Sequence, residues 1–364
     1  MTPIEFRRYI HSHPELSFCE FDTAAFIEQA LAAEGIACRR VATTGVIAKI
    51  EGRGDLSRAV VLRADIDALP IVEATDLEYA SQNEDVMHAC GHDMHAAVLF
   101  GVLQRLNSSP DFEGTIFGLF QPGEELTPGG ASKVLAESPF EGYNVVAVVG
   151  NHVDSTLEVG QIGLCAGPFM ASNDELRFYV RGRGGHGAMR DKIDDTVAAA
   201  ANIVARVNAM NDSDLVLSIG KVQADGATNI IPDLVYMEGT MRTFSQQLRE
   251  HTWTEVAEVA ADVDRYFGTK TEVVIGHGYP TVVNSEELTE LARALAAERY
   301  EAVELDRRYT AEDFGFYTVQ YPSLFYRLGV GSAAGRSHTS TFAPDERAID
   351  VGINFMSELV SKVN

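Results

Sequence analysis

The chain has 364 residues, of which 46% are hydrophobic and 23% charged, which is the composition of an ordinary globular protein long enough for two domains. The formal net charge is -24, with 29 Lys and Arg against 53 Asp and Glu. This charge argues strongly against nucleic acids and anionic membrane surfaces as partners, because proteins bind both through clustered basic residues. It does not argue against a small substrate, since a few local arginines reverse the field inside a pocket.

The beginning of the chain predicts helices followed by an α/β alternation. Helical patterns cover residues 4–15 and 21–35, and the second ends at Gly35, as helix C-termini commonly do. Continuous apolar runs then predict strands that are buried on both faces, with a helical pattern at 96–106 between them. These strands are expected at residues 60–64, 115–120 and 145–150.

The same style of sequence resumes after Pro280. It predicts a helix at 285–300, a strand at 323–329 and a terminal helix from Asp350. We therefore expect an α/β domain with a mainly parallel central sheet and helices on both faces. This catalytic, metal-binding domain is expected to comprise residues 1–172 and 281–364.

A different pattern occupies residues 173–280. Alternating apolar and polar residues predict half-exposed strands, two amphipathic stretches predict helices, and Asp194 or Asp195 is expected to cap the first helix. In chain order the elements are strand 175–182, helix 194–210, strands 215–223 and 234–244, helix 248–268 and strand 271–278. This βαββαβ order predicts a small α+β domain inserted into the larger one.

Cysteine usage and the N-terminal residues indicate the compartment. Cys19, Cys38, Cys90 and Cys165 show no paired spacing, which in a chain of this length favours free thiols in a reducing, cytoplasmic environment. The N-terminal residues lack the apolar stretch of a signal peptide, and no apolar run reaches the ~18 residues of a membrane span. We therefore expect a cytoplasmic protein.

Three polar clusters follow the predicted strands, at the sheet edge where open α/β folds bind ligands. The first, MHACGHDMH (87–95), places Cys90 and His92 two residues apart. A thiolate and an imidazole are donors that zinc and related metals prefer, and Asp93 is placed to orient a ligand. Alone, the run also fits a turn with a buried thiol; a redox thiol fits less well, because no second cysteine lies nearby.

Two pairs of carboxylates follow strands. FQPGEE (120–125) ends in Glu124 and Glu125, which are costly to bury together unless one binds a cation and the other holds a proton beside it. The alternative is a solvated acidic loop. In VLRADIDALP (61–70), Asp65 and Asp67 are two residues apart, so their side chains point to the same side of an extended chain. They are expected to orient metal ligands, although a helix cap or a turn is also possible.

Two further histidines complete a possible ligand set. His152 follows the strand at 145–150, and His338 lies in a distant polar loop, GRSHTSTFAPDE (335–346). Each alone is more often a structural residue. Together with Cys90, His92 and Glu125 they give five donors, too many for one tetrahedral ion and suited to two divalent ions (Zn, Mn, Co or Ni), with Glu124 left as a base.

Motifs along almost the whole chain resemble those of the metal-dependent amidohydrolases in the aminoacylase and carboxypeptidase superfamily. The nearest branch contains hippurate hydrolase, the indole-acetyl-amino-acid hydrolases and N-acetyldiaminopimelate deacetylase. The motifs are RRYIHSHPELSF, LRADIDALPI, MHACGHDMHAA, QPGEE, GNHVD, GRGGHGA, NIIPD, GTMRTF and EDFGFY. Gly123 departs from the alanine that this branch usually has in its Q-P-A-E-E motif.

The resemblance implies a two-metal site with the five donors above as ligands and Glu124 as general base. It implies that the inserted domain is a lid and a homodimer surface. His186 is expected to contact the carbonyl oxygen of the substrate, often across a dimer interface, and Asn229 and Arg242 are expected to contact substrate. Arg242 suits a carboxylate, which a guanidinium binds with two hydrogen bonds, although a surface arginine is equally possible.

The expected reaction is hydrolysis of the amide bond of an N-acyl (N-acetyl or aroyl) amino acid. A dipeptidase or aminopeptidase of the same superfamily and a non-catalytic metal-binding relative are the alternatives. A serine hydrolase is disfavoured, because the chain has no G-x-S-x-G motif. Nucleotide binding at GRGGHG (182–187) is also disfavoured, because no predicted helix begins within that motif.

Overall fold

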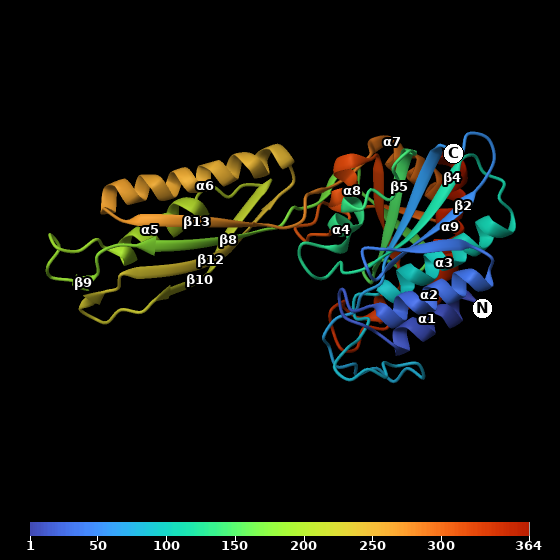
Figure 1. Ribbon diagram of the computed structural model, residues 1–364, viewed down its shortest axis with the longest axis horizontal. Helices are drawn as coiled ribbons and strands as arrows, with labels where there is room; N and C mark the ends of the chain where they lie inside the picture. Colours follow the sequence, from blue (N-terminus) through green and yellow to red (C-terminus); the bar gives the residue numbers. More distant parts are fainter. Residues whose placement is uncertain (364) are drawn as a thin grey trace. The chain divides into compact units, whose positions relative to one another are not determined.

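The computed structural model describes residues 1–363, which form two compact units (Figure 1). Unit 1 consists of Met1–Phe169, Val282–Arg307 and the chain from Asp313 onward. Unit 2 consists of Met170–Thr281 together with Arg308–Glu312, a short return segment that the sequence pattern does not reveal.

The large sheet of unit 1 has eight strands in the order β1-β2-β4-β3-β5-β16-β6-β15. The pairs β4-β3, β3-β5, β5-β16 and β6-β15 are parallel, whereas the pairs β1-β2, β2-β4 and β16-β6 are antiparallel. The prediction of a mainly parallel sheet is therefore confirmed. The strands are β1 (Ala37–Val41), β2 (Gly45–Glu51), β3 (Arg58–Asp65), β4 (Thr115–Gln121), β5 (Asn144–Asp154), β6 (Gln161–Leu164), β15 (Glu301–Glu304) and β16 (Ser323–Gly329), with β7 (Gly167–Met170) and β14 (Val282–Asn284) paired separately.

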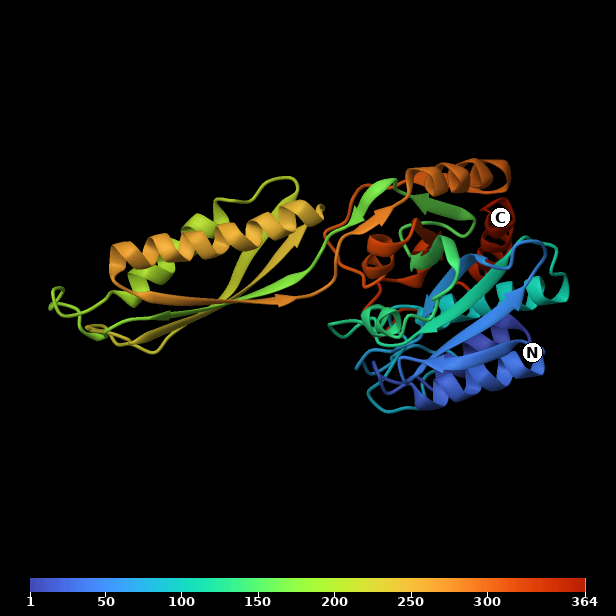
Figure 2. The ribbon, with the colours of Figure 1, turned by 45° about the horizontal axis from the view of Figure 1, so that its top comes forward.

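Helices cover both faces of this sheet, as expected (Figure 2). On one face Phe6 and Phe100 stack with ring centroids 4.3 Å apart, and on the other Phe314 stacks on Phe325 at 4.8 Å. Gly101 lets two helices approach closely, because a Cβ there would lie 2.2 Å from Ile353. The helices are α1 (Pro3–Ser12), α2 (Phe21–Ala33), α3 (His92–Ser108), α4 (Gly130–Ala136), α7 (Glu286–Arg299), α8 (Gly315–Gln320) and α9 (Arg347–Val363).

Helix α3 begins four residues before the predicted start at residue 96. Its N-cap is Gly91, whose φ of +94° favours glycine, and its first turn carries His92 and Asp93. The apolar pattern gave no sign of this turn, because its residues are mostly polar although they are buried. The consequence is that Cys90 and His92 lie at the beginning of a buried helix.

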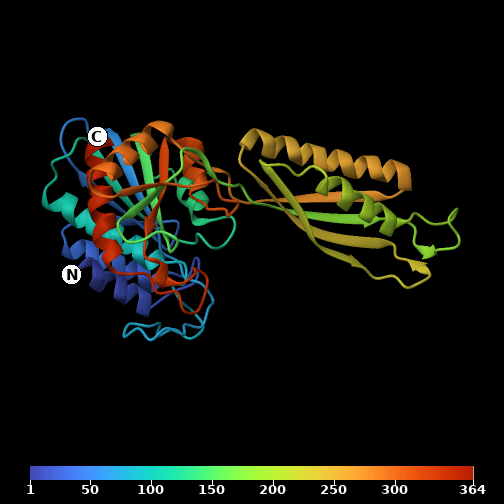
Figure 3. The same ribbon diagram turned by 180° about the vertical axis from the view of Figure 1, so that it is seen from behind.

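Unit 2 has a four-stranded antiparallel sheet in the order β10-β12-β8-β13, with both helices on one face (Figure 3). Asp195 caps α5 by accepting the N–H of Ala198, whereas Asp194 pairs with Arg183. The predicted βαββαβ order is present, with one extra pair of very short strands. The elements are β8 (Asp174–Arg181), β9 (Gly185–His186), α5 (Thr196–Asn208), β10 (Leu215–Ala224), β11 (Ile230–Ile231), β12 (Leu234–Thr243), α6 (Gln246–Phe267) and β13 (Lys270–His277).

None of the helices in residues 1–363 combines the length and the apolar character needed to cross a membrane.

Candidate metal centre

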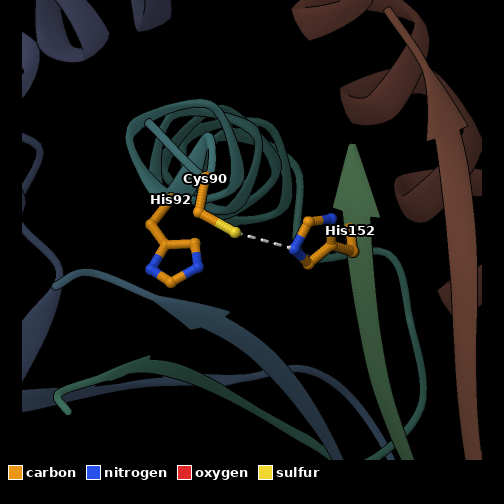
Figure 4. Close-up of side chains that lie close together, drawn as sticks. All are labelled: Cys90, His92 and His152. Carbon is orange, nitrogen blue, oxygen red and sulfur yellow. Dashed lines mark hydrogen bonds between the residues drawn. The ribbon is translucent and has the colours of Figure 1, made fainter. Parts of the chain in front are cut away.

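The five predicted donors meet at one place in unit 1. The Sγ of Cys90 lies 3.3 Å from Nε2 of His152, at the end of β5, with His92 beside it (Figure 4). The same sulfur lies 3.2 Å from Nε2 of His338, which is 248 residues away in the chain. Oε1 of Glu125 lies 3.4 Å from Nε2 of His338 and 3.9 Å from Nε2 of His92.

The donors form two overlapping groups that share one sulfur. Cys90, His92 and His152 form the first group, and Cys90, Glu125 and His338 form the second; within each group the donor atoms lie within 4.8 Å of one another. A third group joins His92 and Glu125 to Glu124. The arrangement therefore offers two adjacent places for a cation, with an additional carboxylate beside them.

The chemistry of these donors fits divalent cations. Among the described residues, His92 Nε2 and Glu125 Oε1 are buried without a hydrogen-bond partner, which is unfavourable unless something else satisfies them. Nitrogen donors bind such ions at about 2.0–2.1 Å and thiolates at about 2.3 Å, so tetrahedral donors lie roughly 3.3–3.6 Å apart. The donor separations of 3.2 to 3.9 Å are close to this range.

Asp67 orients two of the donors. Nδ1 of His92 donates toward the main-chain oxygen of Asp67 at 2.9 Å and toward its Oδ1 at 3.2 Å. Because Nδ1 carries the proton, Nε2 keeps its lone pair for a cation. The N–H of Glu125 donates to Oδ2 of Asp67 at 3.0 Å, so one carboxylate fixes residues of both donor groups.

His95, which the sequence analysis did not single out, also lies in the cluster, together with Asp65 and His92. Its Nδ1 donates to Asp65 at 2.6 Å, and its Nε2 accepts the N–H of Val153 at 2.9 Å. Both ring nitrogens are thus used by the protein, and His95 fixes the backbone next to His152. Its position three residues after His92, one turn along α3, is the signal that could have identified it.

Asp93 serves a different purpose from the one expected. Its Oδ2 accepts hydrogen bonds from Nε of Arg7 at 2.8 Å and from Nδ1 of His11 at 2.9 Å. Both partners belong to α1, so Asp93 joins α3 to α1. Within residues 1–363 it makes no hydrogen bond to any of the five donors, and the expectation that it orients a ligand was wrong.

The His338 loop is held against the Cys90 segment by its backbone. The N–H of His338 donates to the oxygen of Ala89 at 2.8 Å, and that of Ala74 donates to the oxygen of Ser340 at 2.8 Å. His338 has a φ of +61°, a left-handed conformation that is uncommon outside glycine. The backbone therefore directs a half-exposed imidazole toward the buried sulfur.

Burial shifts the pKa of three of the donors. It raises the pKa of the Cys90 thiol well above its usual range and also raises the pKa of Glu125. Burial, together with the charge of Arg327, holds the pKa of His152 well below its usual range, which keeps this imidazole neutral. A neutral imidazole is ready to bind a cation, whereas the thiol must lose its proton when a cation binds.

The predicted substrate-contacting residues lie in unit 2. His186, in β9, accepts the N–H of Ala188 at Nδ1 (3.2 Å), and its Nε2 lies 3.3 Å from Nδ2 of Asn229. Arg242, in β12, donates from Nη1 to the oxygen of Tyr309 at 2.9 Å. His186 and Asn229 are thus brought together.

Arg242 lies at the other end of unit 2 from this pair. His186 is paired with Ile230, which precedes β12, and β12 then runs from Leu234 to Thr243. The strand between Leu234 and Arg242 alone spans about 26 Å at roughly 3.3 Å per residue. One copy of unit 2 therefore does not bring His186 and Arg242 to the same small molecule.

The chain is similar to known proteins over most of its length. The profile of peptidase family M20/M25/M40 matches residues 61–362. N-acetylcysteine deacetylase from Bacillus subtilis (strain 168) is 37% identical over an alignment of 366 positions, which covers 98% of this chain and 95% of the relative. N-acetyldiaminopimelate deacetylase from Exiguobacterium sibiricum is 36% identical over an alignment of 363 positions, which covers 97% of each chain.

A solved structure of a dinuclear metal-binding peptidase of the M20 family from Bacillus subtilis superimposes with a TM-score of 0.89. It is 37% identical, and the match covers 99% of this chain and 97% of the other. The resemblance inferred from the motifs and the predicted fold class are both confirmed. On the family match and the full-length similarity, the chain belongs to peptidase family M20/M25/M40.

Proposed function

We propose that this protein is a metal-dependent amidohydrolase that cleaves the amide bond of an N-acyl amino acid. The observation that carries this proposal is the pair of donor groups that share Cys90, with the carboxylate of Glu124 adjoining them. The names of the two deacetylases, which are similar over almost their full length, support the substrate class.

Two divalent cations would be held by the five donors: Cys90, His92, Glu125, His152 and His338. Bound there, the cations supply Lewis acidity, which polarises a carbonyl oxygen and lowers the pKa of water. The mixture of sulfur, nitrogen and oxygen donors suits zinc, cobalt or nickel, and manganese to a lesser degree. The protein contributes the donors already oriented, with Asp67 fixing His92 and Glu125.

Glu124 is the general base. It is 7% exposed, and a carboxylate oxygen lies within 4.8 Å of donor atoms of His92 and Glu125. It takes a proton from the attacking water, whose oxygen bonds to the amide carbon. It then gives the proton to the amine nitrogen as the C–N bond breaks. The products are a carboxylic acid and a free amino acid.

Unit 2 supplies the substrate contacts. Nδ1 of His186 accepts a backbone N–H, so Nε2 carries the ring proton and is the donor for the negatively charged oxygen that develops on the carbonyl. Asn229 is a second hydrogen-bond donor to the substrate, and Arg242 binds the substrate carboxylate.

A homodimer formed through unit 2 brings His186 of one copy and Arg242 of the other to the same substrate. His186 and Arg242 lie at opposite ends of one unit 2, so a small substrate that meets both needs one of them from a second copy. Unit 2 is then both a lid and the dimerisation surface, and unit 1 is the catalytic domain. The free thiols found within residues 1–363 fit a reducing, cytoplasmic compartment.

A substrate panel combined with one variant tests the proposal. N-acetyl and N-benzoyl amino acids and free dipeptides are assayed after each metal is restored to metal-free protein. We expect the N-acyl amino acids to be cleaved faster, whereas a dipeptidase cleaves the dipeptides faster.

Glu124→Gln should lower kcat about 10²- to 10⁴-fold with its metal content retained. The matched variant Glu141→Gln, at an exposed position, should keep full activity. Full activity in Glu124→Gln would refute the assigned base.

A further inference from the structure

The connector between α1 and α2 lies against the loop that carries Glu124. Leu16 pairs with Ala68 in a short parallel bridge, and the N–H of Ala68 donates to the oxygen of Glu15 at 2.8 Å. The connector therefore runs alongside the segment that contains Asp67. The residues of the connector have no role in the proposed reaction.

The connector anchors the backbone on both sides of Glu124. The carboxylate of Glu20, which is fully buried, accepts the N–H of Gly123 at 2.8 Å. The hydroxyl of Ser17 donates to Oδ2 of Asp67 at 2.6 Å, and this same oxygen accepts the N–H of Glu125 at 3.0 Å. The residues before and after Glu124 are thus both fixed through the connector.

Between these two anchors the ring of Phe18 packs directly on Gly123. A Cβ at Gly123 would lie 2.3 Å from Cε1 of Phe18, closer than carbon atoms approach. Gly123 has a φ of +62°, and Phe18 itself has the same left-handed φ, which is unusual for an aromatic residue. The ammonium of Lys133, in α4, lies 3.3 Å from the centroid of the Phe18 ring. The absence of a side chain at Gly123 is therefore what lets the ring close onto the turn.

We propose that Ser17, Phe18 and Glu20 are positioning residues that hold the Gly123–Glu125 turn, so that the Glu124 carboxylate stays within reach of the proton it transfers. The proposal rests on the proposed function. Proton transfer needs heavy atoms within about 2.6–3.2 Å of each other, and a displacement of about 1 Å costs roughly 10²-fold in rate. A turn free to shift would transfer protons slowly. Because the donor Glu125 lies in the same turn, its metal affinity would also fall, so the variants are compared at saturating metal.

The first test compares Gly123→Ala, Phe18→Ala and the double variant. At saturating metal, Gly123→Ala should lower kcat about 10²-fold with KM unchanged, because the new Cβ displaces the turn. The double variant has space for that Cβ. If displacement of the turn by about 1 Å causes the loss of kcat, the kcat of the double variant should lie within about threefold of that of Phe18→Ala alone. Gly35→Ala is the matched control, because Gly35 has a φ of +71° and nothing within 4 Å of an added Cβ. It should keep the wild-type kcat.

The second test uses a conservative replacement at Glu20. Glu20→Ala removes the acceptor for the Gly123 N–H, whereas Glu20→Gln keeps one. Glu20→Ala should lower kcat and displace the acidic limb of the kcat–pH profile, and Glu20→Gln should restore most of both. If Glu20→Ala does not fold, the Phe18 and Gly123 variants decide the question.

The outcomes separate this proposal from the function on which it rests. A wild-type protein that cleaves no N-acyl amino acid overturns both. An active wild-type enzyme in which Gly123→Ala keeps its kcat, or in which removal of the Phe18 ring gives no recovery, overturns the positioning role alone. Equal losses in Glu20→Gln and Glu20→Ala also count against it.

Discussion

His11 should make the stability of unit 1 depend on pH. This residue of α1 is fully buried, with Nδ1 2.9 Å from Asp93 and Nε2 3.3 Å from Glu73. Burial alone would lower its pKa, but the carboxylates of Asp93 and Glu73 together outweigh burial and raise the pKa from 6.5 to about 9. The folded protein therefore binds this proton more tightly than the unfolded chain.

The magnitude follows from the two pKa values. The difference between 9 and 6.5, at ~1.36 kcal/mol per pKa unit, gives a stabilisation of about 3 kcal/mol. Because the pKa is raised in the folded state, the stabilisation is fully present below pH 6.5 and is lost as the pH rises through 9. It should be about 2 kcal/mol at pH 7.5 and close to zero by roughly pH 10.

Urea unfolding of the wild type and of His11→Asn between pH 5 and pH 10 measures this effect. EDTA is present throughout, so that metal binding does not contribute its own pH dependence. The wild type should be the more stable at pH 5, and the difference in free energy of unfolding should shrink by about 3 kcal/mol towards pH 10. A difference that stays constant, or that grows with pH, would refute the assignment of a buried, protonated His11.

Three further results are expected. Asp67→Ala removes the acceptor that fixes His92 and Glu125, and metal titration should show an affinity about 10- to 100-fold lower; unchanged affinity would contradict this role. Asp195→Ala removes the N-cap of α5 and should lower the unfolding free energy of unit 2 by about 1 kcal/mol, with metal content unaffected. Removal of metal should lower the melting temperature of unit 1, and restoring it at 100 times its dissociation constant should recover about 2.7 kcal/mol for each ion bound; a melting temperature insensitive to metal would argue against a site in unit 1.

The sequence predicted the elements of unit 1 where apolar periodicity was strong. β3, β4 and β5 are continuous apolar runs, and they were placed within a few residues of their observed bounds. The start of α3 was missed because its first turn, which carries His92 and His95, is polar and still buried. Periodicity reports burial only where the buried residues are apolar.

Four of the five candidate donors were predictable because each follows a strand or lies in a cluster of metal-binding residue types. His338 lies in a polar loop and became a candidate only together with the other four. The residues that hold the donors were not, because their partners are distant in the chain. Asp93 and Asp67 look alike in the sequence, yet one pairs with α1 and the other with His92. The contact of Glu20 with Gly123 spans 103 residues, and only the tertiary structure reveals it.

The most direct test is an anomalous-scattering map of crystals grown with zinc or cobalt. The account predicts two metal peaks in unit 1, both within coordination distance of the Cys90 sulfur, about 2.3 Å for zinc. The four other donors should be divided between the two peaks, and Glu124 should bind neither. A single peak, or peaks that leave either Cys90 or His338 uncoordinated, would contradict it.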